Sequence, residues 1–211
     1  MYRIMIVLVA GHSGANTGAV GVNTALYGRL DEGAETIWLR NRVAQLLVER
    51  WNCFVLLDED KDKLAVVIQK IKSVVKENDV CIELHFNSAK NAEACGTEVI
   101  LSDNPTDVEV RIGVQLLNAT AKALGTDIRS IKTEKQTPHR TLAFTHLPCN
   151  SVILEVCFCS NYSDSEIYFR NRELLAASLA KQIALISKQL TEKFLSVNLN
   201  SLIIAESSCL Y

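Results

Sequence analysis

The sequence feature that most restricts the fold is an unbroken apolar run at residues 4–10, Ile-Met-Ile-Val-Leu-Val-Ala. A strand with one face in water would alternate polar and apolar residues, so this run indicates a strand that is buried on both faces. Strands of this kind occur in parallel sheets, whose crossover connections place helices on both sides. The run therefore predicts a central strand of an α/β domain.

The rest of the chain alternates between strand-like and helix-like patterns. Short apolar runs predict strands at residues 54–57, 80–86, 97–101 and 152–158. Amphipathic patterns predict helices that begin at Glu32 and that cover residues 64–75, 107–124 and 173–195. Residues 11–29 and 126–148 are expected to be loops. This order predicts a single-domain, three-layer αβα fold with a mostly parallel, mixed central sheet and helices on both faces.

Charge and hydropathy argue against two classes of partner. The formal net charge is −2 and no dense basic block is present, so we expect neither nucleic acid nor a membrane as a partner. The N-terminal apolar stretch is too short to span a bilayer, and it runs into His12 without a recognisable signal-peptide cleavage site. The chain contains seven cysteines, which we expect to be free thiols in a protein synthesised in the cytoplasm.

Polar residues stand at the ends of three predicted strands. His12 follows the first strand, His85 lies near the end of the 80–86 strand, and Glu155 lies in the 152–158 strand. In an open α/β sheet, ligands bind beyond the carboxyl ends of the strands. Glu32, at the head of a helix, can reach the same edge across the Gly-rich loop. We therefore expect these four side chains to lie together.

These residue types fit one chemistry. Two imidazoles and a carboxylate can hold a zinc ion and leave one position open for water, and a further carboxylate can act as the base. Taken alone, His12 would be interpreted as an ordinary loop residue, and Glu32 as an acidic residue that interacts favourably with the dipole at the start of its helix. Glu155 in an apolar strand is harder to dismiss, because a buried carboxylate needs a partner. Together they predict a zinc hydrolase.

Six short motifs strengthen this interpretation. In chain order they are Gly11-His12-Ser13-Gly14, Gly18-Ala19-Val20-Gly21, Glu32, His85-Phe86-Asn87, Gly96-Thr97-Glu98 and Glu155 through Asn161. Their order and spacing resemble those of the zinc-dependent N-acetylmuramoyl-L-alanine amidases, amidase family 3. The resemblance extends from about residue 4 to residue 190.

The resemblance implies a role for each residue. His12, Glu32 and His85 would bind zinc, and Glu155 would act as general base on the zinc-bound water. The substrate would be peptidoglycan, cut at the amide between N-acetylmuramic acid and L-alanine of the stem peptide. Arg140 stands where the family often has an Arg before its late strand, and we expect it to contact substrate and to help hold the developing oxyanion. Glu35 lies one turn beyond Glu32, but the apolar face of the helix matches the family only when counted from Glu32. Glu35 is therefore expected to be a neighbouring polar residue that faces the same Gly-rich loop.

The resemblance also implies boundaries and a biological role. Residues 1–195 would form the catalytic zinc amidase domain, and residues 196–211 a C-terminal extension of unknown role, in which Leu202 to Ile204 form a late edge strand or a docked segment. A compact catalytic domain without a recognisable export signal resembles a phage or prophage endolysin, made in the cytoplasm and acting on the cell wall. A host enzyme is the alternative role.

Two other functions remain open at this point. A zinc carboxypeptidase-like peptidase can use two His and a Glu as ligands. A catalytically inactive wall-binding module is the third reading, and the presence of all four site residues counts against it. Around the site, Glu83 is expected either to orient a ligand or to form a structural salt bridge, and Glu98 is expected to orient a ligand. His139 and His146 are expected at the surface or beside the site. The sequence indicates neither the peptidoglycan chemotype nor an oligomeric state.

Overall fold

The centre of the fold is a six-stranded sheet in the order β4-β1-β5-β8-β6-β7. The computed structural model describes residues 3–12 and 18–208, with side chains described up to residue 196. The strands are β1 (Met5–Ala10), β4 (Phe54–Leu57), β5 (Val80–Asn87), β6 (Thr97–Leu101), β7 (Ile128–Thr133) and β8 (Asn150–Phe158). Neighbours from β4 to β8 are parallel, β6 is antiparallel to β8, and β7 is parallel to β6. The predicted mostly parallel, mixed sheet is confirmed.

Strand β1 is buried on both faces, as its apolar run predicts. It lies between β4 and β5, and every residue in it is buried. Alternate side chains enter two different apolar clusters, with Ile6 and Leu8 in one and Val7 and Val9 in the other. This alternation follows from the two-residue period of a strand.

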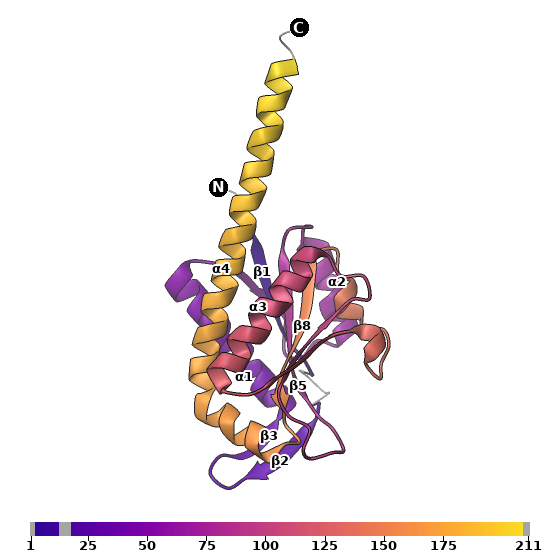
Figure 1. Ribbon diagram of the computed structural model, residues 1–211, viewed down its shortest axis with the longest axis vertical. Helices are drawn as coiled ribbons and strands as arrows, with labels where there is room; N and C mark the ends of the chain where they lie inside the picture. The colour runs from indigo at the N-terminus through magenta and orange to yellow at the C-terminus, as the bar shows by residue number, and fades with distance from the viewer. Residues whose placement is uncertain (1–2, 13–17, 209–211) are drawn as a thin grey trace.

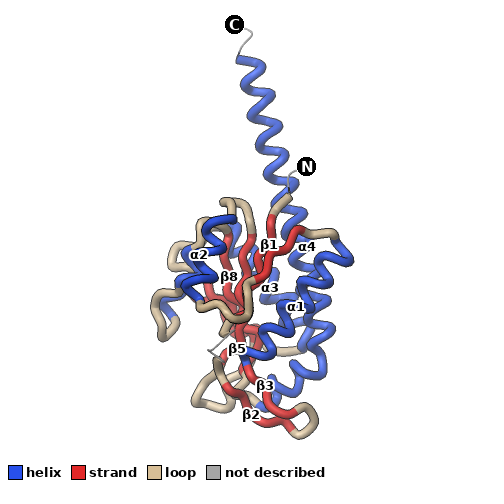
Figure 2. The backbone as a smooth tube through the Cα atoms, turned by 180° about the vertical axis from the view of Figure 1, so that it is seen from behind, coloured by secondary structure: helices blue, strands red, loops and turns tan. Residues whose placement is uncertain are grey.

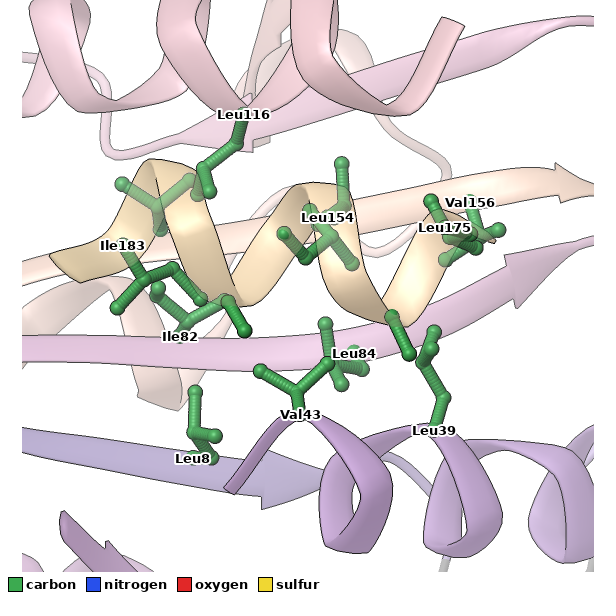
Figure 3. Packing of buried hydrophobic residues seen from close by; sticks show 14 of the residues in the cluster. Leu8, Leu39, Val43, Ile82, Leu84, Leu116, Leu154, Val156, Leu175 and Ile183 are labelled. Carbon is green, nitrogen blue, oxygen red and sulfur yellow. The ribbon is translucent and has the colours of Figure 1, made fainter. Parts of the chain in front are cut away.

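Helices cover both faces of the sheet. Helices α1 (Glu32–Trp51), α3 (Asp107–Leu124) and α4 (Tyr162–Ser208) pack on one face, and α2 (Leu64–Val74) lies on the other, as Figures 1 and 2 show from opposite sides. Figure 3 shows the larger cluster, in which strand residues meet helix residues; it labels Leu8, Leu39, Val43, Ile82, Leu84, Leu116, Leu154, Val156, Leu175 and Ile183. The three-layer αβα arrangement is therefore as expected.

Two segments that were expected to be loops contain strands. Residues 11–29 include β2 (Val20–Thr24) and the start of β3 (Gly28–Asp31), which form a two-stranded antiparallel sheet. Residues 126–148 include the edge strand β7 and two 3₁₀ turns, η1 (Glu134–Gln136) and η2 (Ala143–His146). The sequence did not indicate β7, because an edge strand leaves much of its surface in water and so lacks a continuous apolar run. Its six residues are all exposed or half-buried.

Helix α4 is longer than the sequence pattern indicates. It begins at Tyr162, where the Asn161 side chain accepts a hydrogen bond from the backbone N–H of Asp164 (2.9 Å). It then continues through the expected boundary at residue 195 to Ser208, and Figure 1 shows its C-terminal part extending beyond the sheet. An edge strand at Leu202 to Ile204 is therefore wrong, since this segment is helical.

The structure adds two facts to the expectations about membranes and cysteines. None of the helices in the described ranges is long and apolar enough to cross a bilayer. The six cysteines within the described ranges are free thiols, and Cys209 lies outside them. Two of these thiols, Cys81 and Cys149, are buried and lie 3.2 Å apart.

Two adjacent leucines of α4 test the packing of the core. Leu175 is 0% exposed in the main cluster, whereas Leu174 is 58% exposed. We expect Leu175→Ala to lower the free energy of unfolding by about 2–5 kcal/mol, because it leaves a cavity. Leu174→Ala should change it by about 0.5 kcal/mol or less. Chemical denaturation measures both, and equal losses would contradict this packing.

Candidate active site

The end of β1 is tied to β5 just before His12. The backbone N–H of Gly11 donates to the carbonyl of Leu84 (2.9 Å), and the Thr36 hydroxyl of α1 donates to the carbonyl of Gly11 (2.8 Å). His12 follows with a φ of 60°, in the left-handed region that residues with a side chain avoid. Such conformations persist where the surrounding structure enforces them, often at functional sites. Ser13 and Gly14 of the expected motif lie outside the described residues.

Glu32 occupies the centre of the site. It is buried at the first position of α1, and two backbone N–H groups hold its carboxylate: Ala19 donates to Oε2 (2.7 Å) and Phe86 donates to Oε1 (3.0 Å). The same carboxylate lies 3.0 Å from Nδ1 of His85 and 3.8 Å from Nε2 of His12. Segments around residues 12, 19, 32 and 85 therefore converge on one carboxylate.

The three side chains form a candidate metal site. One ligand atom from each of His12, Glu32 and His85 lies within 4.8 Å of the others. Within the described ranges, this is the single group of three or more potential ligands that meets this geometry. The rings of His12 and His85 meet edge to face, with their centroids 5.0 Å apart. Two imidazoles and one carboxylate are a donor set typical of catalytic zinc sites.

Two glycines provide the space that this arrangement needs. A Cβ at Gly11 would overlap the His85 ring, and a Cβ at Gly18 would overlap both the Glu32 carboxylate and His12. Gly18 also has a φ of 69°, which a residue with a side chain adopts only with strain. The glycines of the first two motifs thus allow close approach of the candidate ligands.

Charge is unevenly distributed around His85. Burial disfavours the charged imidazole, but the carboxylates of Glu83 and Glu32 outweigh this effect and raise the pKa of His85. Burial likewise tends to raise the pKa of Glu32, but the hydrogen bond and the charge of His85 prevail and lower it. Glu83 Oε2 lies 3.4 Å from His85 Nε2, so the ring has a carboxylate at each nitrogen. This surplus of negative charge favours a bound cation.

Glu155 lies beside His85 on the neighbouring strand. The two residues are register partners across β5 and β8, and Glu98 of β6 is the partner of Glu155 on its other side. Oε2 of Glu155 is buried and has no hydrogen-bond partner among the described residues. Burial is the main cause that raises the pKa of Glu155 to about 7; the charge of His85 acts in the opposite direction. A carboxyl group with this pKa can both accept and release a proton near neutral pH.

Glu98 orients other residues and not the candidate ligands. Its Oε2 accepts a hydrogen bond from the side-chain amide of Asn87 (2.6 Å). Its Oε1 accepts from Ser130 (3.0 Å) and Lys132 (2.6 Å), and lies 2.9 Å from Nε of Arg129. The buried carboxylate therefore links β6 and β7 to the last residue of β5.

Glu35 points elsewhere. Its carboxylate accepts hydrogen bonds from the Tyr168 hydroxyl (2.8 Å) and from Arg172 (3.0 Å), both on α4. The sequence had indicated that Glu35 would face the same Gly-rich loop as Glu32. Although the two residues are one helical turn apart, the carboxylate of Glu32 lies beside the histidines, whereas the carboxylate of Glu35 joins α1 to α4.

The remaining candidates lie on the loop between β7 and β8. Arg140 is exposed, has a φ of 59°, and donates its backbone N–H to the carbonyl of Thr137 (3.3 Å). Its neighbour His139 lines the cleft described below, whereas Arg140 is not among the lining residues. His146 pairs with the buried Glu134 (2.9 Å). A substrate contact by Arg140 stays a prediction.

A cleft of about 920 Å³ opens over the site. The residues His12, Glu32, His85 and Glu155 all line it. One wall comes from the loop and first turn at residues 58–64, and another comes from residues 136–144. The sequence did not indicate these walls, because the acidic residues of the first and the Pro-containing segment of the second are typical of ordinary solvated loops. The volume lies within the range of typical ligand sites.

Comparison with known proteins identifies the family. Residues 6–195 match the family model described as N-acetylmuramoyl-L-alanine amidase. The chain belongs to this amidase family. No curated protein matches the sequence.

Solved structures with this fold include other amidases. A Neisseria meningitidis protein assigned as an N-acetylmuramoyl-L-alanine amidase is 27% identical, with a TM-score of 0.71 and coverage of 86% of this chain and 94% of that one. The CwlD amidase of Clostridioides difficile, solved in complex with the GerS lipoprotein, is 18% identical, with a TM-score of 0.67 and coverage of 93% and 100%. The catalytic domain of an endolysin that targets Clostridium difficile is 19% identical, with a TM-score of 0.66 and coverage of 86% and 97%.

Proposed function

We propose that this amidase uses zinc to cleave the amide bond between N-acetylmuramic acid and the L-alanine of the peptidoglycan stem peptide. One observation supports this most strongly. His12, Glu32 and His85 bring three ligand atoms within 4.8 Å, and the Glu155 carboxyl, whose pKa is raised to about 7, lies in the same cleft. The family supplies the peptidoglycan substrate, and the arrangement of side chains supplies the chemistry.

The residues present fit a zinc ion. The donor set is suitable, Gly11 and Gly18 leave space for the ligands, and Oε2 of Glu155 is a buried acceptor without a partner among the described residues. A bound zinc ion would supply a Lewis acid that polarises the scissile carbonyl and makes water more acidic, with a pKa of ~7.

The protein's own side chains account for the proton transfers and the positioning. Glu155 accepts the proton of the attacking water and passes it to the leaving amine, for which a pKa of about 7 is well suited. The backbone N–H groups of Ala19 and Phe86 fix the carboxylate of Glu32. Glu83, 3.4 Å from Nε2 of His85, restrains the ring of that ligand. Arg140, on the turn next to the cleft-lining His139, would contact the substrate.

For the biological role we propose a bacteriolytic endolysin, synthesised in the cytoplasm and acting on the cell wall. Its likeness to an endolysin catalytic domain supports this role. The likeness to the CwlD amidase keeps a host enzyme as the alternative. Residues 1–195 would carry the activity, and residues 196–211 would form the extension.

The products of digestion test the reaction. Purified peptidoglycan treated with zinc-loaded protein should yield intact stem peptides with new L-alanine amino termini, as measured by mass spectrometry. A chelator should abolish their release, and stoichiometric zinc should restore it. Release of the C-terminal residue alone would identify a carboxypeptidase, and a wall-binding module would release nothing. Full activity in protein shown to be zinc-free would contradict the proposed metal dependence.

Substitutions at three glutamates test the assigned roles. Glu155→Gln should retain zinc and reduce turnover by ~10²–10⁴-fold, the usual loss for a general base. Glu32→Ala should lower zinc affinity first, so excess zinc should partly restore its activity. Glu35→Ala is the matched control and should keep its metal, because Glu35 contacts Tyr168 and Arg172.

Zinc per chain and release of L-alanine amino termini are measured for all three variants. Loss of metal from Glu35→Ala but not from Glu32→Ala would show that the ligand is one turn further along α1. A fully active Glu155→Gln would exclude Glu155 as the base.

A further inference from the structure

The loop between β7 and β8 supplies one wall of the cleft. Thr137 and His139 line the cleft with hydrogen-bonding groups, and Leu142 and Phe144 line it with apolar ones. Residues 137–142 lie between the two 3₁₀ turns and belong to no helix or strand. The position of this wall therefore depends on the side chains and turns of the loop itself.

The two ends of the loop are fixed by contacts outside it. At one end the backbone N–H of Lys135 donates to Asp103 (3.1 Å), and the ammonium group of Lys135 lies 2.9 Å from the same carboxylate. At the other end Phe144 and Leu147 are buried in the apolar cluster that also contains Val67 of α2. The conformation of residues 137–142, between these ends, needs a separate explanation.

Glu134 contacts both sides of the loop. Its buried carboxylate accepts hydrogen bonds from the backbone N–H of Leu142 (2.7 Å) and from the hydroxyl of Thr145 (3.1 Å), and it lies 2.9 Å from Nε2 of His146. Its backbone carbonyl accepts from the N–H (2.9 Å) and the hydroxyl (2.7 Å) of Thr137. Burial tends to raise the pKa of Glu134, but the donors around the carboxylate outweigh this effect and lower it. The loop is therefore closed around an ionised carboxylate at neutral pH.

The other polar contacts of residues 137–142 stay inside the loop. The backbone N–H of Arg140 donates to the carbonyl of Thr137, and that of Thr141 donates to the carbonyl of His139. All hydrogen bonds that these six residues form in the described structure have their partners within residues 134–146. Glu134 is not among the described residues that line the cleft, so it can affect a substrate only through the loop.

We propose that residues 137–142 form a substrate-binding loop and that Glu134 is its positioning residue, which holds the loop in the conformation that lines the cleft. This inference rests on the proposed amidase function, because the ligand is the muropeptide. Without the carboxylate, the loop leaves the cleft in a larger fraction of molecules, and the apparent affinity falls by that fraction. The candidate metal ligands and Glu155 lie outside this loop, so the chemical step itself is retained.

The test measures KM and kcat separately with a soluble muropeptide and the zinc-loaded full chain. Glu134→Ala should raise KM by about tenfold and keep kcat within about twofold of wild type, because it removes hydrogen bonds to a charged group that support binding and not chemistry. Glu134→Gln keeps an amide oxygen that can accept from Leu142 and Thr145, so its KM should rise by only about twofold to threefold. Zinc per chain should be unchanged in both variants.

A second variant weakens the same contact from the other side. The hydroxyl of Thr145 lies 3.1 Å from the Glu134 carboxylate and 2.8 Å from the carbonyl of Leu142. Thr145 is buried and is not among the described residues that line the cleft. Thr145→Val removes this hydroxyl with little change of shape and should raise KM by about twofold to fivefold. If Glu134→Ala does not fold, Glu134→Gln and Thr145→Val decide, and wild-type KM values in both overturn the proposal.

The matched control removes a buried carboxylate elsewhere. Glu109 of α3 accepts hydrogen bonds from the backbone N–H of Thr106 (2.8 Å) and of Ser151 (3.1 Å), and it is not among the described residues that line the cleft. Glu109→Ala should lower the melting temperature but leave KM close to wild type. An equal rise of KM in Glu109→Ala and Glu134→Ala, or a wild-type KM in a folded Glu134→Ala, would overturn the proposed role. A wild-type protein that cleaves no muropeptide would instead reject the amidase function.

Discussion

The carboxylate of Glu32 joins segments that are distant in the sequence, and the geometry of the site depends on it. Backbone N–H groups of Ala19 and Phe86 hold its two oxygens, and the imidazoles of His12 and His85 lie next to it. Because donors come from the Gly-rich segment and from β5, the start of α1 is fixed against both. Gly18 is essential to this contact, since a side chain there would overlap the carboxylate.

The sheet places Glu155, the proposed general base, relative to this centre. Parallel pairing of β5 with β8 brings Glu155 beside His85, and antiparallel pairing of β8 with β6 brings Glu98 to its other side. Glu98 is neutralised by cations of β7, whereas Glu155 has a buried oxygen without a partner among the described residues. Two adjacent glutamates thus differ in role because their neighbours differ: one orients Asn87, and the other is suited to proton transfer.

Five strands of the main sheet, the helices and the meeting of His12, Glu32, His85 and Glu155 could be predicted, because each depends on local patterns and on the rule that parallel strands share one edge. Strand β7 could not, because an edge strand has no continuous apolar run. The early start of α4 rests on the Asn161 cap, and its first turn has no apolar stripe.

The central claim is that His12, Glu32 and His85 together hold one zinc ion beside Glu155, which is not itself a ligand. X-ray absorption at the zinc edge, combined with anomalous diffraction from crystals of the zinc-loaded protein, tests it most directly. We expect one zinc per chain, with two imidazole nitrogens and one carboxylate group from the protein and the remaining position taken by solvent. A sulfur ligand, or a zinc ion bound by Glu155 in place of Glu32, would contradict it.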